Sequence, residues 1–83
     1  MGACQRCETE WYGLRIVIED PEHFKVFIYD PGECEVLYTA ERMSIDAAKL
    51  AAVDWVATAH FGPSHDLKPG IVAAMLVWEN RLV

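Results

Sequence analysis

Apolar residues alternate along three segments, residues 11–19, 24–30 and 34–40, with the period of two that is typical of β-strands. β-Branched and aromatic residues are frequent in these segments, which favours strand over helix. In each segment both alternating sets contain large apolar residues, so both faces of the resulting sheet are expected to be hydrophobic. Such a sheet needs a cover on each face.

Proline-containing turns separate the three expected strands. Residues 20–23 (Asp-Pro-Glu-His) have the composition of a type I turn. Residues 30–33 (Asp-Pro-Gly-Glu) favour a type II turn, in which Gly32 takes the positive φ of the second central position. The second turn predicts that the second and third strands form a hairpin. The three segments together predict an antiparallel meander.

Helical periodicity begins after the third strand. Ser44 is a suitable N-cap, and the apolar residues that follow have the spacing of one buried stripe, until Gly62 and Pro63 end the helix at about residue 60 or 61. A second helix is expected from about Pro69 to near the last residue. Its main apolar stripe is formed by Ile71, Met75, Trp78 and Leu82.

These elements predict an α+β fold: a three-stranded antiparallel meander followed by two α-helices packed on the sheet (β-β-β-α-α). The expected organisation is a polar N-terminal segment, residues 1–10, and a single α+β domain, residues 11–83. The first helix is expected to cover one face of the sheet. The second is expected to cover the other face, either in its own chain or in a second copy. The residues predicted to form that contact are Val17, Phe27, Tyr29, Leu37, Ile71, Met75, Trp78 and Leu82.

Composition narrows the classes of partner. In 83 residues the hydrophobic content is 53% and the formal net charge is −6. A core this small is naturally supplemented by a partner subunit, so a homodimer is expected. The acidic charge disfavours nucleic acid and anionic membrane surfaces and favours a basic protein partner. The chain has no apolar run of about 18 residues that could span a membrane, and its first residues are polar, so a cytoplasmic protein is expected.

Three cysteines raise the possibility of a metal site. Cys4 and Cys7 have the two-residue gap that lets two thiolates bind one zinc ion, and Cys34 together with His23, His60 or His65 would have to complete the site. The remaining ligands are single and scattered, so an exposed cysteine pair explains the spacing better. A zinc-binding domain that uses Cys4 and Cys7 remains an alternative, and no cofactor is expected.

The sequence also contains residue types that serve in catalysis. Ser64, His65 and Asp66 are the three types of a hydrolytic triad, but such triads are assembled from separate segments, and capping of the second helix by Ser64 or Asp66 explains them better. Acidic residues cluster at the strand-linking turns, where a solvated rim that blunts sheet edges is the commoner role. We therefore expect a non-catalytic protein-interaction or assembly module rather than an enzyme.

The predicted order of elements resembles a known family. Three antiparallel strands with a Pro-Gly turn, followed by Ser44 capping an alanine-containing helix, are similar to the small β-β-β-α domains of the HicB-like antitoxin group, which resemble double-stranded-RNA-binding-like folds. The resemblance covers about residues 11–61, and it implies an acidic protein that neutralises a basic toxin. The apolar second helix departs from the DNA-binding segment of that group, so no site residues are transferred.

Overall fold

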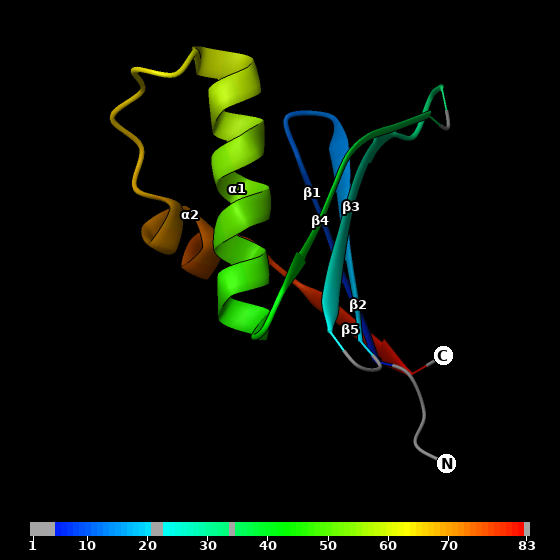
Figure 1. Ribbon diagram of the computed structural model, residues 1–83. Helices are drawn as coiled ribbons and strands as arrows, with labels where there is room; N and C mark the ends of the chain where they lie inside the picture. Colours follow the sequence, from blue (N-terminus) through cyan, green and yellow to red (C-terminus); the bar gives the residue numbers. More distant parts are fainter. Residues whose placement is uncertain (1–4, 21–22, 34, 83) are drawn as a thin grey trace.

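The computed structural model describes residues 5–20, 23–33 and 35–82 (Figure 1). In chain order the elements are β1 (Gln5–Trp11), β2 (Leu14–Asp20), β3 (Phe24–Asp30), β4 (Glu35–Arg42), α1 (Ile45–Phe61), α2 (Pro69–Met75) and β5 (Glu79–Leu82). The strands form one antiparallel sheet in the order β4-β3-β2-β1-β5. The α+β class is therefore confirmed, but the sheet has five strands where the sequence predicted three.

The first predicted strand, residues 11–19, is wrong as a single strand. Tyr12 and Gly13 have φ of 51° and 76°, so they form a tight two-residue turn between β1 and β2. A positive φ is unfavourable for tyrosine, but the Tyr12 ring stacks on His60 at 4.1 Å between centroids, which holds the turn against the end of α1. β1 therefore begins at Gln5, within the expected polar head.

The second predicted helix ends early. α2 stops at Met75, and Leu76 adopts extended backbone angles. The following residues form β5, which pairs with residues 5–8 of β1. The sequence prediction failed here because it did not include β1, whose outer edge exposes backbone N–H and C=O groups that a further strand can satisfy.

The hairpin predicted between β3 and β4 is confirmed, but its turn is not type II. Gly32 has no positive φ. Instead the Gly32 N–H donates to the Asp30 carboxylate at 2.9 Å and the Glu33 N–H donates to the Asp30 carbonyl at 3.1 Å, which is the pattern of an Asx-stabilised type I turn. A register shift follows next to Tyr29, so Val36 lies on the same face as Tyr29 and Leu37 is the additional residue of a bulge.

The boundaries predicted for the first helix are confirmed. The Ser44 hydroxyl accepts the Ala47 N–H at 3.1 Å, and Gly62, with φ of 96°, donates its N–H to Thr58 at 2.8 Å. Small residues on one stripe let α1 approach the sheet closely. The buried cluster between them contains Cys7, Ile16, Ile18, Val26, Ile28, Ala48, Ala52 and Val56.

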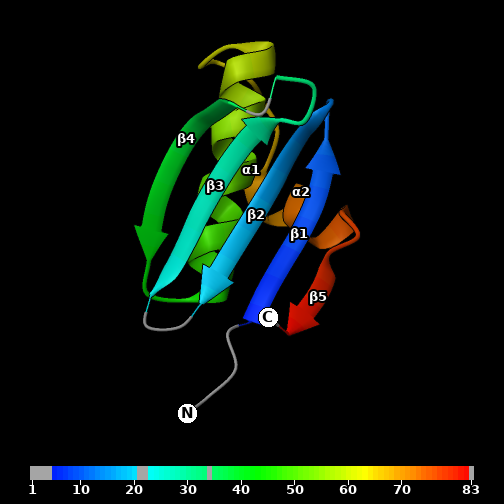
Figure 2. The ribbon, with the colours of Figure 1, turned by 90° about the vertical axis from the view of Figure 1, so that its right-hand side faces the viewer.

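The helices lie on one side of the sheet. α1 packs against β2, β3 and β4, and α2 packs against α1 (Figure 1). Seen from the opposite side, the sheet lies in front and both helices lie behind it (Figure 2). The expectation that a second helix covers the other face of its own sheet is therefore wrong, because α2 is short and the residues after it return to the edge of β1. We call the uncovered side the open face.

Candidate functional site: the open face of the sheet

Strand register fixes which side chains share the open face. The core cluster takes alternate residues of β1, β2 and β3, so the residues between them point to the other side. They form three rows across the sheet, which we name in order from the β1–β2 turn. The first row is Glu10, Arg15, Tyr29 and Val36; the second is Glu8, Val17, Phe27 and Thr39; the third is Arg6, Glu19, Lys25 and Glu41.

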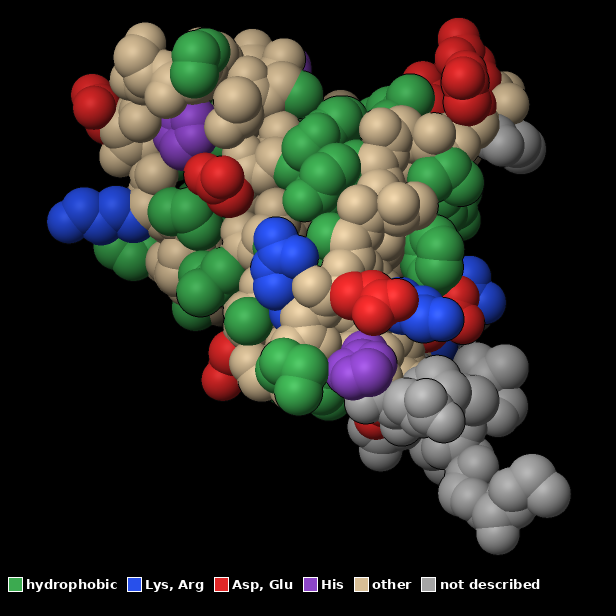
Figure 3. All heavy atoms as spheres, in the orientation of Figure 1, with side chains coloured by type: hydrophobic (Ala, Val, Ile, Leu, Met, Phe, Trp, Pro, Cys, Tyr) green, Lys and Arg blue, Asp and Glu red, His purple; other side chains and the backbone are tan. Residues whose placement is uncertain are grey.

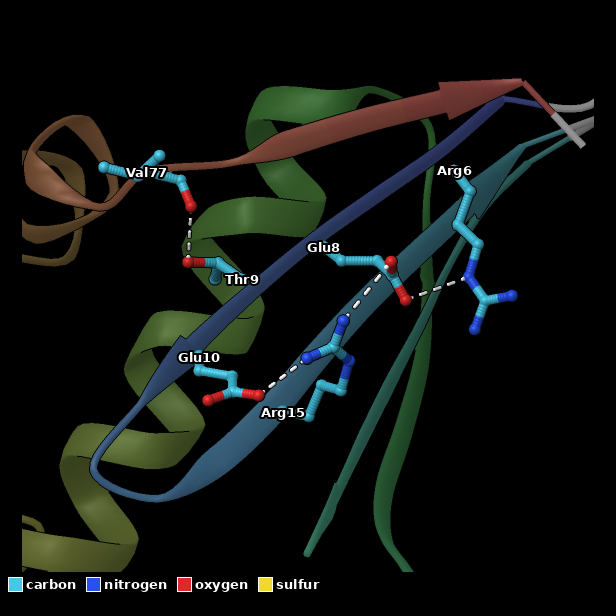
Figure 4. Close-up of polar contacts among 6 residues, drawn as sticks. All are labelled: Arg6, Glu8, Thr9, Glu10, Arg15 and Val77. Carbon is cyan, nitrogen blue, oxygen red and sulfur yellow. Dashed lines mark hydrogen bonds and ion pairs between the residues drawn. The ribbon is translucent and has the colours of Figure 1, made fainter. Parts of the chain in front are cut away.

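The part of the open face on β1 and β2 carries a charge cluster (Figure 4). Glu8 is only 4% exposed. One of its carboxylate oxygens lies 3.3 Å from Arg6 Nε, and the other lies 3.4 Å from Arg15 Nη2. Arg15 Nη1 also donates to Glu10 Oε1 at 2.6 Å. The buried carboxylate is thus held between two guanidinium groups, which compensate for its loss of hydration.

The charge of Arg15 is fixed by its surroundings. Burial acts to lower the pKa of Arg15, but the negative charge of Glu8 and hydrogen bonds to Glu10 and Glu8 outweigh it and raise the pKa above its ordinary value. Arg15 therefore remains protonated throughout the range in which proteins fold. The cluster can orient and pair charges, but Arg15 cannot act in it as an acid or a base.

The part of the open face on β3 and β4 is largely apolar. Phe27 and Tyr29 are half-buried, and Val36 and Leu37 are exposed. Val17, at the centre of the face, is only 1% exposed although no helix covers it. Its cross-strand neighbours Glu8 and Phe27 and the long side chains beside it on β2 shield it from water. Figure 3 shows hydrophobic side chains reaching the surface along β4.

A hollow of about 540 Å³ adjoins the charge cluster where β5 begins. β5 pairs only with residues 5–8 of β1, so the hollow opens beside the rest of that strand. The Thr9 hydroxyl donates to the Val77 carbonyl at 2.8 Å and fixes the chain at this point (Figure 4). The lining residues are Glu8, Thr9, Glu10, Arg15, Met75, Leu76, Val77 and Glu79.

The eight residues predicted to form one contact fall into two groups. Val17, Phe27 and Tyr29 lie in neighbouring rows of the open face, and Leu37 is the additional residue of the bulge on β4 beside Tyr29. Ile71, Met75, Trp78 and Leu82 do not reach that group within the chain, so the intrachain contact is wrong. α2 carries Ile71 and Met75, which are exposed, and Leu82 lies in β5.

Trp78 lies between the core under α1 and the segment formed by α2 and the start of β5. Its Nε1 donates to the Ala73 carbonyl at 2.9 Å, and Lys49 Nζ lies 5.0 Å from the centre of its ring. The ring packs against the core cluster under α1. These contacts connect α2 and the start of β5 to the core, so Trp78 is part of the interior and not of an exposed helical stripe.

Of the three cysteines considered as zinc ligands, the structure describes only Cys7. Cys7 is buried against α1, and Cys4 and Cys34 lie outside the described residues. Burial raises the pKa of the Cys7 thiol; the positive charge of Lys49 opposes this and the negative charge of Glu8 adds to it. Cys7 is therefore a protonated core residue at neutral pH. Among the residues that the structure describes, no three His, Cys, Asp or Glu side chains are placed to hold a metal ion.

Of the three residues that resembled a hydrolytic triad, His65 has a structural role. His65 turns toward α1, where its Nε2 lies 3.4 Å from Thr58 Oγ1 and 3.7 Å from Asp54 Oδ1. These contacts hold the loop between the helices against α1. The predicted capping of the second helix by Ser64 or Asp66 is wrong, because α2 begins at Pro69 and its N-cap, Lys68, makes no side-chain capping bond.

Sequence reasoning missed the charge cluster because it assigned residues 1–10 to a polar head. A signal for β1 was present: Cys7, Thr9 and Trp11 alternate with Arg6, Glu8 and Glu10. Read together with the turn at Tyr12 and Gly13, this alternation has the period of a strand with one charged face. The burial of Glu8 and its position between two arginines could not be inferred without the pairing of β1 with β2.

Comparison of the chain with protein-family models, curated proteins and solved structures finds no match. Within residues 5–20, 23–33 and 35–82, no helix combines the length and apolar character needed to cross a membrane.

Proposed function

We propose that this protein is a non-catalytic protein-interaction module that assembles with a second copy through the open face of its sheet. The observation that carries the proposal is the open face itself. It places Phe27, Tyr29, Val36 and Leu37 at the surface of a sheet whose other side is covered by α1. An apolar strip bordered by paired charges is the usual composition of a protein interface.

The charges of the open face favour a protein partner over a nucleic acid or an anionic membrane. Its three rows contain four glutamates, two arginines and one lysine, and the whole chain has a formal charge of −6. A phosphate-binding surface needs an excess of positive charge, which this face does not have. A protein surface with both charges and an apolar centre is a better complement.

The face is a better contact than the outer edge of β4. That edge carries a bulge at Leu37, and Glu35, Glu41 and Arg42 flank its central residues. Bulges and charges are the features that prevent strands of two molecules from pairing edge to edge. Association through stacked sheet faces avoids both obstacles.

The size of the face predicts a weak association. Four strands about 4.8 Å apart and three rows about 6.7 Å apart give a footprint of roughly 20 by 20 Å. Stacking two such faces buries about 1,000 Å² in total, which is at the lower limit for specific interfaces. A dissociation constant in the micromolar range is therefore expected.

The test compares the parent chain with Phe27→Asp by sedimentation velocity over about 1 to 500 µM. The parent is expected to change from monomer to dimer across this range, and Phe27→Asp is expected to remain monomeric because it places a charge at the apolar centre. The matched control is Met43→Asp, which changes another exposed apolar residue outside the three rows. Circular dichroism verifies that each variant is folded. A parent that stays monomeric, or a Phe27→Asp variant that dimerises like the control, would contradict the proposal.

A second candidate function is a HicB-like, antitoxin-type binder of a basic partner protein. The formal charge of −6 favours it, and the hairpin of β3 and β4 followed by α1 retains the order of elements that suggested it. β1 and β5 are additions to that expected layout. The candidate predicts that a basic protein binds the open face with an affinity that falls steeply with salt. Binding that is independent of salt would remove it.

A further inference from the structure

We infer that the second copy docks with its strands aligned, about a two-fold axis that runs parallel to the strands between β2 and β3. This inference rests on the proposed function and specifies the orientation of the partner. Such an axis places β2 of one copy over β3 of the other, and β1 over β4. Each row then faces the same row of the second copy in reverse order, so the rows themselves can be tested for complementarity.

The third row is complementary to itself under this rotation. In strand order it reads Arg6, Glu19, Lys25 and Glu41, so its charges alternate in sign. Reversal brings Glu19 opposite Lys25 of the second copy and Arg6 opposite Glu41 of the second copy. The axis repeats each contact, so the dimer gains four attractive charge contacts at one end of the interface and no repulsive one.

The other two rows are compatible with the same arrangement. In the second row, Phe27 of the second copy lies over Val17 and the side chains that shield it, which completes the burial of the partly exposed ring. In the first row, Arg15 meets Tyr29 of the second copy. The raised pKa of Arg15 keeps it positively charged, and a guanidinium over an aromatic ring is a favourable contact. Glu8 faces Thr39, an uncharged side chain.

The other simple two-fold arrangement is less favourable. An axis perpendicular to the strands along the second row would place every residue of that row over its own counterpart. Glu8 would then face Glu8 of the second copy, bringing two buried carboxylates together in a region from which water is excluded. This axis would also bring Arg6 over Glu10 and Glu19 over Arg15 of the second copy, so both arrangements gain four attractive charge contacts. The aligned arrangement alone avoids the contact between the two Glu8 carboxylates, and that contact selects between the two axes.

The experiment exchanges one charge pair between two chains. Glu19→Lys and Lys25→Glu each reverse one charge at exposed or partly exposed positions of the third row. In a dimer of either variant with itself, the two contacts between positions 19 and 25 become repulsive. In a mixed dimer both contacts are again between opposite charges. The repulsion that each variant gains inside its own chain, where positions 19 and 25 are also cross-strand neighbours, is not relieved by mixing.

Native mass spectrometry of a mixture, with one chain labelled with ¹⁵N, measures the three dimers directly. Each variant alone is expected to dimerise at least about tenfold more weakly than the parent, and the mixed dimer is expected to form within about threefold of the parent. The difference in affinity between the mixed dimer and the dimers of each variant alone should decrease in high salt. Mixed dimers at only the statistical proportion, or single variants that dimerise like the parent, would overturn the aligned arrangement.

The outcomes separate this inference from the proposed function. If the parent dimerises, Phe27→Asp abolishes the dimer and the mixture shows no preference, the open face is the interface but the orientation is wrong. If the parent is monomeric at every concentration, both are wrong. Should either charge reversal prevent folding, the pair Glu19→Gln and Lys25→Gln replaces it. The mixed dimer of these two variants retains one native charge pair, while a dimer of either variant with itself retains none. An excess of mixed dimers would again support the aligned arrangement, and the absence of an excess would contradict it.

Discussion

Replacement of Glu8 by glutamine tests whether the buried carboxylate stabilises the open face. Glutamine keeps the shape of the side chain and removes its negative charge. Arg6 and Arg15 then lose their shared partner in a region where Glu8 itself has little contact with water. Breaking a fully buried pair from one side costs about 3–5 kcal/mol. Because the side chains of Arg6 and Arg15 remain 35% and 25% exposed, water compensates in part for the lost contact. We expect Glu8→Gln to lower the free energy of unfolding by about 2 kcal/mol.

For a domain of this length, a loss of about 2 kcal/mol lowers the melting temperature by roughly 10 °C. The measurement is thermal and urea unfolding followed by circular dichroism at low micromolar concentration, where the proposed dimer contributes little. A simultaneous change in the urea m-value would indicate a change in the unfolded or native ensemble and not only in stability.

Glu10→Gln is the matched control. Its carboxylate contacts the same Arg15 at a shorter distance, 2.6 Å, but the Glu10 side chain is 58% exposed. Exposed ion pairs contribute about 0.5 kcal/mol or less because water and salt screen them. The two substitutions thus differ chiefly in burial. Equal losses of stability for Glu8→Gln and Glu10→Gln would show that burial does not strengthen the Glu8 contacts, since distance and charge alone would then explain both.

Two further predictions concern the hydrogen bond that holds the segment before β5 and the glycines at the helix ends. Thr9→Val keeps the side-chain shape but removes the hydrogen bond to the Val77 carbonyl. We expect the free energy of unfolding to fall by about 1 kcal/mol and amide exchange in β5 to become faster. Unchanged exchange would show that this bond does not hold the strand. Gly62→Ala forces φ of 96° on alanine and should cost about 1 kcal/mol, whereas Gly70→Ala, whose Cβ would lie 3.7 Å from Leu50, should be neutral or slightly stabilising in thermal unfolding. Equal effects at the two glycines would contradict the assignment of the cost to the backbone.

The elements that sequence reasoning identified correctly are those whose signals lie within a few neighbouring residues. The alternation in residues 24–30 and 34–40 indicated the hairpin of β3 and β4. Ser44 and Gly62 marked the two ends of α1, and their capping bonds confirm both. In each case the side chain and the backbone group that it satisfies are close in sequence, so the interaction can be inferred before the fold is known.

Of the two missed strands, β1 pairs with the neighbouring β2, whereas β5 depends on a partner far away in the chain. Residues 5–8 and 79–82 pair with each other, although neither segment has the apolar alternation of the central strands. β5 forms where α2 was expected to continue, and the apolar residues of that segment fit a helical stripe equally well. A short run of this kind has no local preference strong enough to decide between helix and strand.

The candidate site divides in the same way. The sequence grouped Val17, Phe27, Tyr29 and Leu37 on one face, and the structure brings them together. The sequence also predicted that the second helix would cover these residues, and this prediction is wrong within the chain. The other part of the face, with Glu8 between Arg6 and Arg15, was not predicted, because it exists only when β1 lies beside β2.

Local patterns along the chain specify a sheet with apolar residues on both faces and a capped helix that packs against it. Periodicity encodes this, since side-chain direction in a strand or helix follows from residue number alone. Which face stays open, and which charges meet on it, follows only from the pairing of the strands in the folded chain. The β1–β2 hairpin brings Glu8 between Arg6 and Arg15, and the face stays open because the segment after α2 pairs with the edge of β1. That second pairing joins residues more than seventy positions apart, which no local pattern records.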